Sequence, residues 1–323
     1  MINDFLLAAV LGLVEGLTEF LPVSSTAHIR LAQWAIQGQA SLKDPFWKLF
    51  AVAIQLPAVL AVVVFFHDSI LRFLKSFFRG GQTFGDRLRH PVTLVMIAFV
   101  TTAVPAVLAK KLIKGNLESL YVMGGALIVG GIVMAVVDTI FGRRERAILA
   151  DAEAARLADQ PPEPATPFDT IAEYKPVPPL PPIVTQLDQM KPWQAVWIGA
   201  VQVLSAVFPG TSRSMATIAA GQVANLTRAC ALEFSFFLSI PIMLAAFVKD
   251  MKDSLDPKDA DYVGHALTRH EVLLLMTGSL VSFVVALAVI AWFMAWVRRR
   301  GFMPFAIYRV IIGVVVLAVA SRA

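Results

Sequence analysis

The sequence contains six apolar segments, each about as long as a membrane-spanning helix. A helix needs about 20 mostly apolar residues to cross the hydrocarbon core of a bilayer. The segments that qualify are 46–66, 92–109, 119–141, 229–248, 271–297 and 303–321. Charged residues make up only 16% of the chain and hydrophobic residues 57%, whereas a soluble domain carries about 25% charged residues. The sequence therefore predicts an all-α integral membrane protein.

Two other apolar stretches, 5–36 and 194–226, do not fit a simple span. A proline and a polar run near the middle divide each stretch into halves that are too short for a hydrocarbon core of about 30 Å. Broken backbone at membrane depth is tolerated only where it is buried in protein or lines a water-filled cavity. We therefore expect each stretch to form a re-entrant helix hairpin.

The two broken stretches resemble each other at a constant offset of 187 residues. The matching positions are Gly12 and Gly199, Pro22 and Pro209, and Ser25 and Ser212. Three spans follow each stretch, and because three is an odd number the second copy is inverted in the membrane. The sequence thus predicts an inverted-topology repeat, each half a re-entrant helix hairpin plus three transmembrane helices. Such repeats place a site near the bilayer midplane, where broken helices of both halves meet.

The repeats are expected at 1–141 and 194–323, joined by a soluble, proline-rich linker at 142–193. Its first part, 145–159, is rich in alanine and favours a helical extension of the third span. Ten of the nineteen prolines of the chain follow between 161 and 192, a composition typical of an extended spacer.

The net charge of +5 lies mainly in the loops, where it sets membrane topology rather than binding nucleic acid. One set of loops carries 15 Lys and Arg residues and the other set carries 9. The richer set is 67–91, 142–193, 221–228 and 298–302, and we expect it on the cytoplasmic side. Both termini are then expected outside.

Polar side chains at membrane depth mark the first broken stretch. Glu15 and Glu19 are four residues apart and share one face of a helix. Ionisable groups within a membrane are costly and by default indicate a functional site. The two carboxylates could hold a hard divalent cation such as Mg²⁺ or Ca²⁺, together with phosphate oxygens.

After Pro22, which cannot extend the first helix, Ser24, Ser25 and Thr26 are suitable N-caps for a second helix. His28 lies three residues after Ser25, so both face the same side of that helix. Either Ser25 or His28 could serve as nucleophile or as the base that activates it. Simple helix capping and a core histidine are the alternatives.

The second broken stretch carries hydroxyls and one cation around the start of a helix. Ser212, Ser214 and Thr217 surround Arg213 in the sequence. Exposed N–H groups and the helix dipole favour an anion there, and the planar guanidinium matches two phosphate oxygens at once. We expect phosphate binding, with an internal salt bridge from Arg213 to Glu15 or Glu19 as the alternative.

The copies differ at the positions that carry chemistry. At the offset of 187, the pairs are Glu15 and Gln202, Glu19 and Ala206, Thr26 and Arg213, and His28 and Met215. The first copy therefore holds the acid, base and metal groups, and the second copy holds the cation.

The segments 15–28 and 208–217 resemble the two signature motifs of the undecaprenyl-diphosphate phosphatase (BacA/UppP) family. The resemblance covers nearly the whole chain. It implies a bacterial inner (plasma) membrane enzyme that removes the terminal phosphate of undecaprenyl diphosphate, a polyprenyl lipid, with its site facing the periplasm. This reaction recycles the lipid carrier for peptidoglycan and protects against bacitracin. The resemblance also implies a homodimer.

Matched motif by motif, the resemblance assigns site roles to several positions of this chain. These are Glu15, Glu19, Ser25 and His28 in the first motif, Ser212, Arg213 and Thr217 in the second, and, with weaker support, Gln55 and Arg309. Thr26 and Ser214 are further candidates for substrate binding. Arg309 also stands alone in the last apolar span, where snorkelling to the membrane surface is the alternative.

The predicted mechanism is a clamp of the diphosphate by Arg213, Ser212 and Thr217, with the cation on Glu19 and Glu15. Ser25 then attacks the terminal phosphorus with help from His28, or His28 attacks directly. The alternative function is a transporter or flippase of a phosphorylated polyprenyl lipid, because inverted repeats with broken helices are also typical of transporters. A membrane scaffold that uses the proline-rich segment would leave both polar motifs unexplained.

Overall fold

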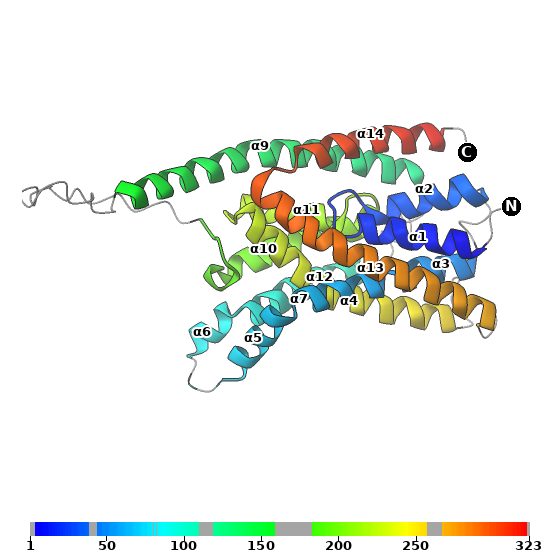
Figure 1. The fold of residues 1–323 in the computed structure, drawn as a ribbon, viewed down its shortest axis with the longest axis horizontal. Helices are drawn as coiled ribbons and strands as arrows, with labels where there is room; N and C mark the ends of the chain where they lie inside the picture. The colour runs from blue at the N-terminus through cyan, green and yellow to red at the C-terminus, as the bar shows by residue number, and fades with distance from the viewer. Residues whose placement is uncertain are drawn as a thin grey trace, which may run out of the picture.

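The computed structural model describes residues 4–38, 44–79, 81, 83–109, 119–158, 183–256 and 267–321. Helices dominate this part of the chain, and an isolated bridge between Val184 and Leu226 is its only β-type pairing. Figure 1 shows an elongated bundle with both termini at one end. The residues 159–182, which hold nine of the ten prolines counted in the linker region, lie outside the described residues.

Six helical segments among the described residues are long and apolar enough to cross a membrane, which is consistent with an integral membrane protein. The first, Pro45–Phe65, consists of α3 (Pro45–Ala53) and α4 (Gln55–Phe65). The others are α7 (Pro91–Leu108), α9 (Leu120–Ala158), α12 (Arg228–Leu255), α13 (Arg269–Arg299) and α14 (Met303–Ala320). At 1.5 Å per residue, the 39 residues of α9 extend about 58 Å. This helix therefore continues well beyond a bilayer core, as the alanine-rich segment predicts.

Each broken stretch folds as two short helices joined by an irregular segment. The first pair is α1 (Asp4–Thr18) and α2 (Ser25–Gln37), and the second is α10 (Pro192–Val207) and α11 (Arg213–Val223). None of the four exceeds 16 residues. The breaks coincide with Pro22 and Pro209, because proline lacks the N–H that would continue the helix.

Three shorter elements complete the described structure. They are α5 (His67–Phe77), α6 (Phe84–Arg89) and the 3₁₀ turn η2 (Leu187–Gln189). In Figure 1, α5 and α6 project from the bundle at the end opposite the termini.

Helices from the first half of the chain pack against helices from the second half. α1 lies along α13 and α10 lies along α7, while α4 contacts α12 and α9 contacts α14. Glycine permits the closest crossings: a Cβ on Gly12 would overlap the carbonyl oxygen of Gly278, and one on Gly199 would overlap that of Ala98. Small residues at such contacts are what lets membrane helices approach closely.

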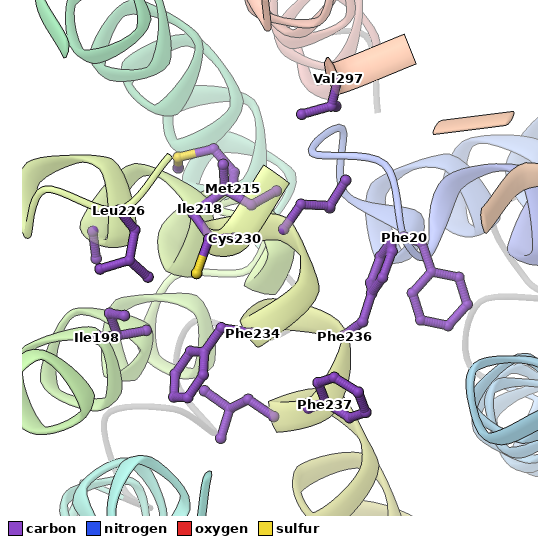
Figure 2. Packing of buried hydrophobic residues seen from close by; sticks show 14 of the residues in the cluster. Phe20, Ile198, Met215, Ile218, Leu226, Cys230, Phe234, Phe236, Phe237 and Val297 are labelled. Carbon is purple, nitrogen blue, oxygen red and sulfur yellow. The ribbon is translucent and has the colours of Figure 1, made fainter. Parts of the chain in front are cut away.

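The main core lies where the irregular segment after α1 meets α12. Phe20 packs edge-on against Phe236 with ring centroids 5.3 Å apart, and Figure 2 shows both rings near Phe237. Met215 and Ile218 of α11 belong to the same cluster, as does the buried Cys230. The two broken stretches thus share one apolar core.

A buried ionic cluster fixes the junction of α9, α12 and α14. The Nε of Arg228 donates to Oδ1 of Asp138 at 2.7 Å, and the N–H of Phe302 donates to Oδ2 at 2.9 Å. The backbone N–H of Arg228 also donates to the carboxylate of Glu145. Each charge is paired, as burial requires.

Candidate active site

The two irregular segments end on the same unusual backbone conformation. Ser24, directly before α2, has φ 73°, and Ser212, directly before α11, has φ 69°. Positive φ is uncommon for residues other than glycine, and strained backbone of this kind gathers at functional sites. The Ser212 hydroxyl caps α11 by accepting from the N–H of Met215 at 3.4 Å, whereas Ser24 makes no side-chain cap.

The offset of 187 is wrong by one residue after the prolines. Two residues separate Pro22 from the start of α2, but three separate Pro209 from the start of α11. The extra position accommodates Gly210, at φ 96°, where a Cβ would overlap the carbonyl oxygen of Met123. In the structure, therefore, Ser24 corresponds to Ser212, and Ser25 rather than Thr26 corresponds to Arg213.

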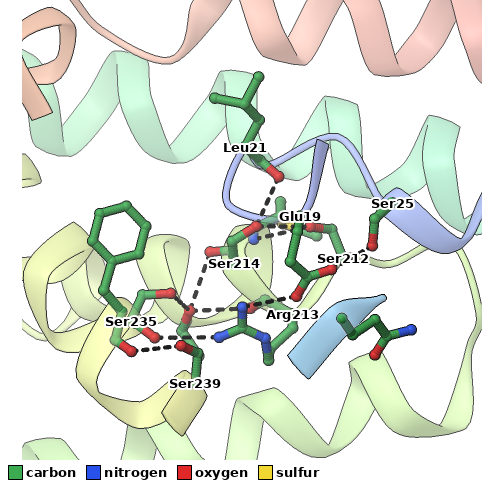
Figure 3. A network of polar contacts seen from close by, with 12 residues as sticks. Glu19, Leu21, Ser25, Ser212, Arg213, Ser214, Ser235 and Ser239 are labelled. Atoms are coloured by element: carbon green, nitrogen blue, oxygen red, sulfur yellow. Dashed lines mark hydrogen bonds and ion pairs between the residues drawn. The ribbon is translucent and has the colours of Figure 1, made fainter. Parts of the chain in front are cut away.

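Glu19 joins the first residues of both helices. Its Oε2 accepts a hydrogen bond from the Ser25 hydroxyl at 2.5 Å, and its Oε1 lies 3.1 Å from Nη2 of Arg213. Figure 3 shows the carboxylate between the two side chains. The Glu19 and Arg213 side chains are only 8% and 12% exposed. The salt bridge considered as an alternative to phosphate binding is thus present in the ligand-free structure.

Serine and threonine hydroxyls hold Arg213 and α11 in place. Nη1 of Arg213 donates to the carbonyl of Ser235 at 3.3 Å, and the hydroxyls of Thr217 and Ser235 lie 2.6 Å apart. Ser214 donates to the carbonyl of Leu21 at 2.9 Å. This last bond links α11 to the first irregular segment, and Figure 3 shows the network.

Glu15 is the unpaired acid of the site. It is fully buried, and neither carboxylate oxygen has a hydrogen-bond partner among the described residues. Glu19 and Arg213 lie close enough to act on it electrostatically. Burial of a carboxyl group with no hydrogen-bond partner is costly.

The donor set of these carboxylates fits a hard divalent cation that also binds phosphate. The described residues contain no group of three or more His, Cys, Asp or Glu side chains suited to a metal ion. Mg²⁺ is commonly held by one or two carboxylates, with substrate phosphates and water completing its coordination. The free oxygens of Glu15 are compatible with that arrangement.

His28 contacts α14 rather than Ser25. Its Nδ1 lies 2.7 Å from the carbonyl of Ser24 and its Nε2 lies 2.7 Å from the hydroxyl of Tyr308. A carbonyl only accepts, so Nδ1 carries the proton, and in the neutral ring Nε2 accepts from Tyr308. The two rings are stacked with centroids 5.5 Å apart. The hydroxyl of Ser25, by contrast, donates to Glu19.

Arg309 connects the two irregular segments. The side chain is fully buried, and its guanidinium donates to the carbonyls of Pro22, Gly210 and Ala126 at 3.0–3.2 Å. Complete burial excludes snorkelling to the surface. Because Pro22 and Gly210 belong to different halves, one side chain sets the position of both segments.

Two candidates from the sequence lie apart from this network. Thr26 is exposed, and Gln55, at the start of α4, donates to the carbonyl of Ala51 in its own span at 3.3 Å. Their part in substrate binding stays a prediction.

Sequence reasoning missed Tyr308 and Ser235. Tyr308 directly precedes the candidate residue Arg309 in an apolar span. This neighbouring position was the sequence signal that could have identified Tyr308. Ser235 and Ser239 are four residues apart in α12 and so share one face of an apolar helix. This polar pair was the sequence signal that could have identified Ser235.

Comparison with known proteins agrees with this picture. Residues 8–315 match the family model described as bacitracin resistance protein BacA. A relative from Koribacter versatilis named undecaprenyl-diphosphatase is 47% identical over 99% of both chains. Relatives of the same name from Caldanaerobacter subterraneus and Nitrobacter hamburgensis are 34% and 36% identical over 98% and 97% of this chain, and 96% of each of theirs. With its two motifs on one buried network and a match along nearly its whole length, the chain belongs to the BacA family.

Proposed function

We propose that this protein is a membrane phosphatase that hydrolyses undecaprenyl diphosphate to undecaprenyl phosphate and phosphate. The name of the full-length relatives supports the activity. The structural observation that carries it is the position of Glu19 between a hydroxyl nucleophile, Ser25, and a phosphate-binding cation, Arg213. Through this reaction the protein recycles the lipid carrier of cell-wall synthesis and confers resistance to bacitracin.

Arg213 and the N-terminus of α11 bind the diphosphate. The guanidinium lies at the first residue of the helix, where free N–H groups and the helix dipole also favour an anion. The Ser212 hydroxyl lies at the same helix start as a further donor, while Ser214 and Thr217, whose hydroxyls donate to Leu21 and Ser235, hold that helix start in position. As the phosphate enters, it competes with Glu19 for the guanidinium, which releases the carboxylate for proton transfer.

Ser25 is the nucleophile and Glu19 its base. As the Ser25 oxygen bonds to the terminal phosphorus, its proton passes to Glu19, and the anhydride P–O bond breaks to release undecaprenyl phosphate. Water then attacks the phosphoserine, Glu19 returns its proton to the serine oxygen as the Ser25 O–P bond breaks, and both protons of the water leave with the released phosphate as H₂PO₄⁻. The short bond between Ser25 and Glu19 supports this assignment over attack by His28, whose Nε2 is engaged by Tyr308.

Glu15, with Glu19, would hold a divalent cation, Mg²⁺ or Ca²⁺. Bound there, such an ion neutralises charge on the phosphate oxygens. The buried oxygens of Glu15, which have no partner among the described residues, support this assignment.

The proposal also covers the repeat architecture, the membrane orientation and the oligomeric state. The chain is an inverted-topology repeat whose two broken stretches are re-entrant hairpins. Reciprocal packing supports this: the first hairpin helix of one half packs on the middle span of the other, α1 on α13 and α10 on α7. The Lys and Arg distribution supports an orientation with both termini outside the cytoplasm, and the family resemblance supports a site that faces the periplasm of a bacterial inner membrane. We also propose a homodimer, from the family resemblance.

The test is phosphate release from undecaprenyl diphosphate by purified protein in detergent, with and without chelator. Arg213→Ala should abolish release, while Arg156→Ala, which removes an exposed arginine of the α9 extension, should leave it unchanged. Loss of release in chelator, with recovery on adding Mg²⁺ or Ca²⁺, supports the cation. No release by well-folded wild-type protein would contradict the phosphatase, and lipid movement across vesicles would then be the assay for the transporter alternative.

A further inference from the structure

The hairpin of α5 and α6 is attached to the membrane at both ends. α5 begins at His67, two residues after the first span ends, and α6 ends at Arg89, two residues before α7 begins. With 11 residues, α5 is only about 16 Å long. The hairpin therefore remains next to the bilayer surface in any arrangement of the spans.

One side of α5 holds the hairpin against the bundle. Phe73 packs against Phe237 of α12 with ring centroids 5.9 Å apart, and Phe77 packs against His90 at 5.3 Å. The hydroxyl of Ser76 also lies 2.9 Å from Nε2 of His90. The orientation of α5 is thus fixed, and with it the direction of its remaining faces.

An adjacent side exposes large apolar side chains. Leu71, Leu74 and Phe78 follow one another at helical spacing and are 49%, 40% and 80% exposed. On α6, Phe84 and Leu88 are one turn apart and 83% and 37% exposed. Apolar side chains gathered in this way mark a surface that binds a partner or a membrane. We refer to these five residues as the apolar edge.

Basic residues accompany the apolar edge. Arg72, Lys75, Arg79, Arg87 and Arg89 are all exposed. The same segment contains only two acids, Asp68 and Asp86. Asp86 is engaged in a capping box, in which the hydroxyl and N–H of Thr83 donate to its carboxylate and lower its pKa. The surface as a whole is therefore positively charged.

We propose that the hairpin is an interfacial anchor that binds anionic phospholipid, with the apolar edge inserted at the level of the headgroups. An amphipathic helix with basic residues beside its apolar face lies in the membrane interface and gains affinity from anionic lipid. Attachment to two spans brings this face to the bilayer at no cost in translational freedom. This lipid surface is separate from the phosphate site, and the proposal does not depend on the activity.

The test measures the membrane depth of spin labels in the full-length protein. In a Cys230→Ala background, single cysteines are introduced as Phe78→Cys, Phe84→Cys and, on the polar side as matched control, Asp68→Cys. Each protein is placed in bilayers of phosphatidylglycerol with phosphatidylethanolamine, in phosphatidylcholine bilayers, and in detergent. Collisions of each label with oxygen and with a water-soluble nickel complex report its depth.

In anionic bilayers we expect labels at 78 and 84 to meet the nickel complex at least about threefold less often than the label at 68. This difference in collision rate between the labels should be smaller in phosphatidylcholine bilayers. In anionic bilayers it should be smaller when the charges are reversed by Lys75→Glu with Arg79→Glu. Equal exposure of all three labels would overturn the proposal. Equal protection in both lipids would overturn the requirement for anionic lipid, and protection that rises with protein concentration in detergent would assign the face to a second copy.

Discussion

The guanidinium of Arg213 donates to Glu19 at 3.1 Å across 194 residues of sequence, and so joins the two halves of the chain inside the site. Buried ion pairs are weak evidence for stability, because the desolvation of both charges offsets their attraction. The same carboxylate also accepts a hydrogen bond from Ser25. A role in catalysis therefore explains this ion pair better than a contribution to stability.

Two substitutions of Arg213 distinguish the contribution of its positive charge from that of its planar guanidinium. Arg213→Ala should lower kcat/KM at least about 100-fold, as loss of a transition-state donor does. Arg213→Lys should recover only part of this, since an ammonium cannot donate to two phosphate oxygens in one plane. Steady-state phosphate release measures both, and equal activity of the lysine variant and wild type would refute two-point binding.

Glu19→Gln tests the proposed base. It keeps the size of the side chain and removes its charge, so kcat should fall about 10²–10⁴-fold, the usual contribution of general base catalysis. Single-turnover kinetics would separate loss of the base from loss of binding. A variant with normal kcat and a raised KM would assign Glu19 to binding alone.

Tyr308→Phe removes one hydroxyl and keeps the ring stacked on His28. If His28 assists the attack of Ser25, loss of its hydrogen bond, worth about 1 kcal/mol, should lower kcat about fivefold and displace the pH profile. If Tyr308 serves only to pack, the pH profile will coincide with that of the wild type.

Arg309→Met should destabilise the protein as well as inactivate it. Three backbone carbonyls lose their donor, and a buried unsatisfied polar group costs about 1–3 kcal/mol. Thermal unfolding in detergent measures the loss, with Arg299→Met at the exposed end of α13 as the control. Equal thermal stability of the two variants would show that the carbonyl contacts contribute little.

Two glycines with different surroundings provide a matched pair. Gly12→Ala places a methyl group against the backbone of Gly278 and should destabilise the protein by about 1–3 kcal/mol. Gly125→Ala meets no atom within 4 Å and should be neutral or stabilising, since alanine favours helix. The same thermal measurement compares them, and equal effects would contradict the close contact of α1 and α13.

Much of this fold could be predicted because its determinants are local. Hydropathy over about 20 residues identifies each span, and Pro22 and Pro209 mark the breaks. The placement of Ser25 was not predictable in the same way. Helical spacing puts it beside His28, but at the first position of α2 its hydroxyl reaches back to Glu19.

Contacts between distant segments account for the rest. The pairing of His28 with Tyr308 joins residues 280 positions apart, and no periodic pattern links them. An alignment of the two motifs does not reveal the extra residue at Gly210, because Pro209 and Ser212 on either side of it still match Pro22 and Ser25 at the offset of 187. Only the helix starts show that Ser25, and not Thr26, is the counterpart of Arg213.

The position of Arg309 has a consequence for how the protein is made. The side chain that holds both Pro22 and Gly210 lies in α14, which is synthesised after all the other described helices. Until that helix arrives, the carbonyls of both irregular segments lack this donor, although Glu19 and Arg213 have already been synthesised. The observed arrangement of the two irregular segments therefore depends on α14, and a chain cut before that helix lacks the contact by which Arg309 joins them.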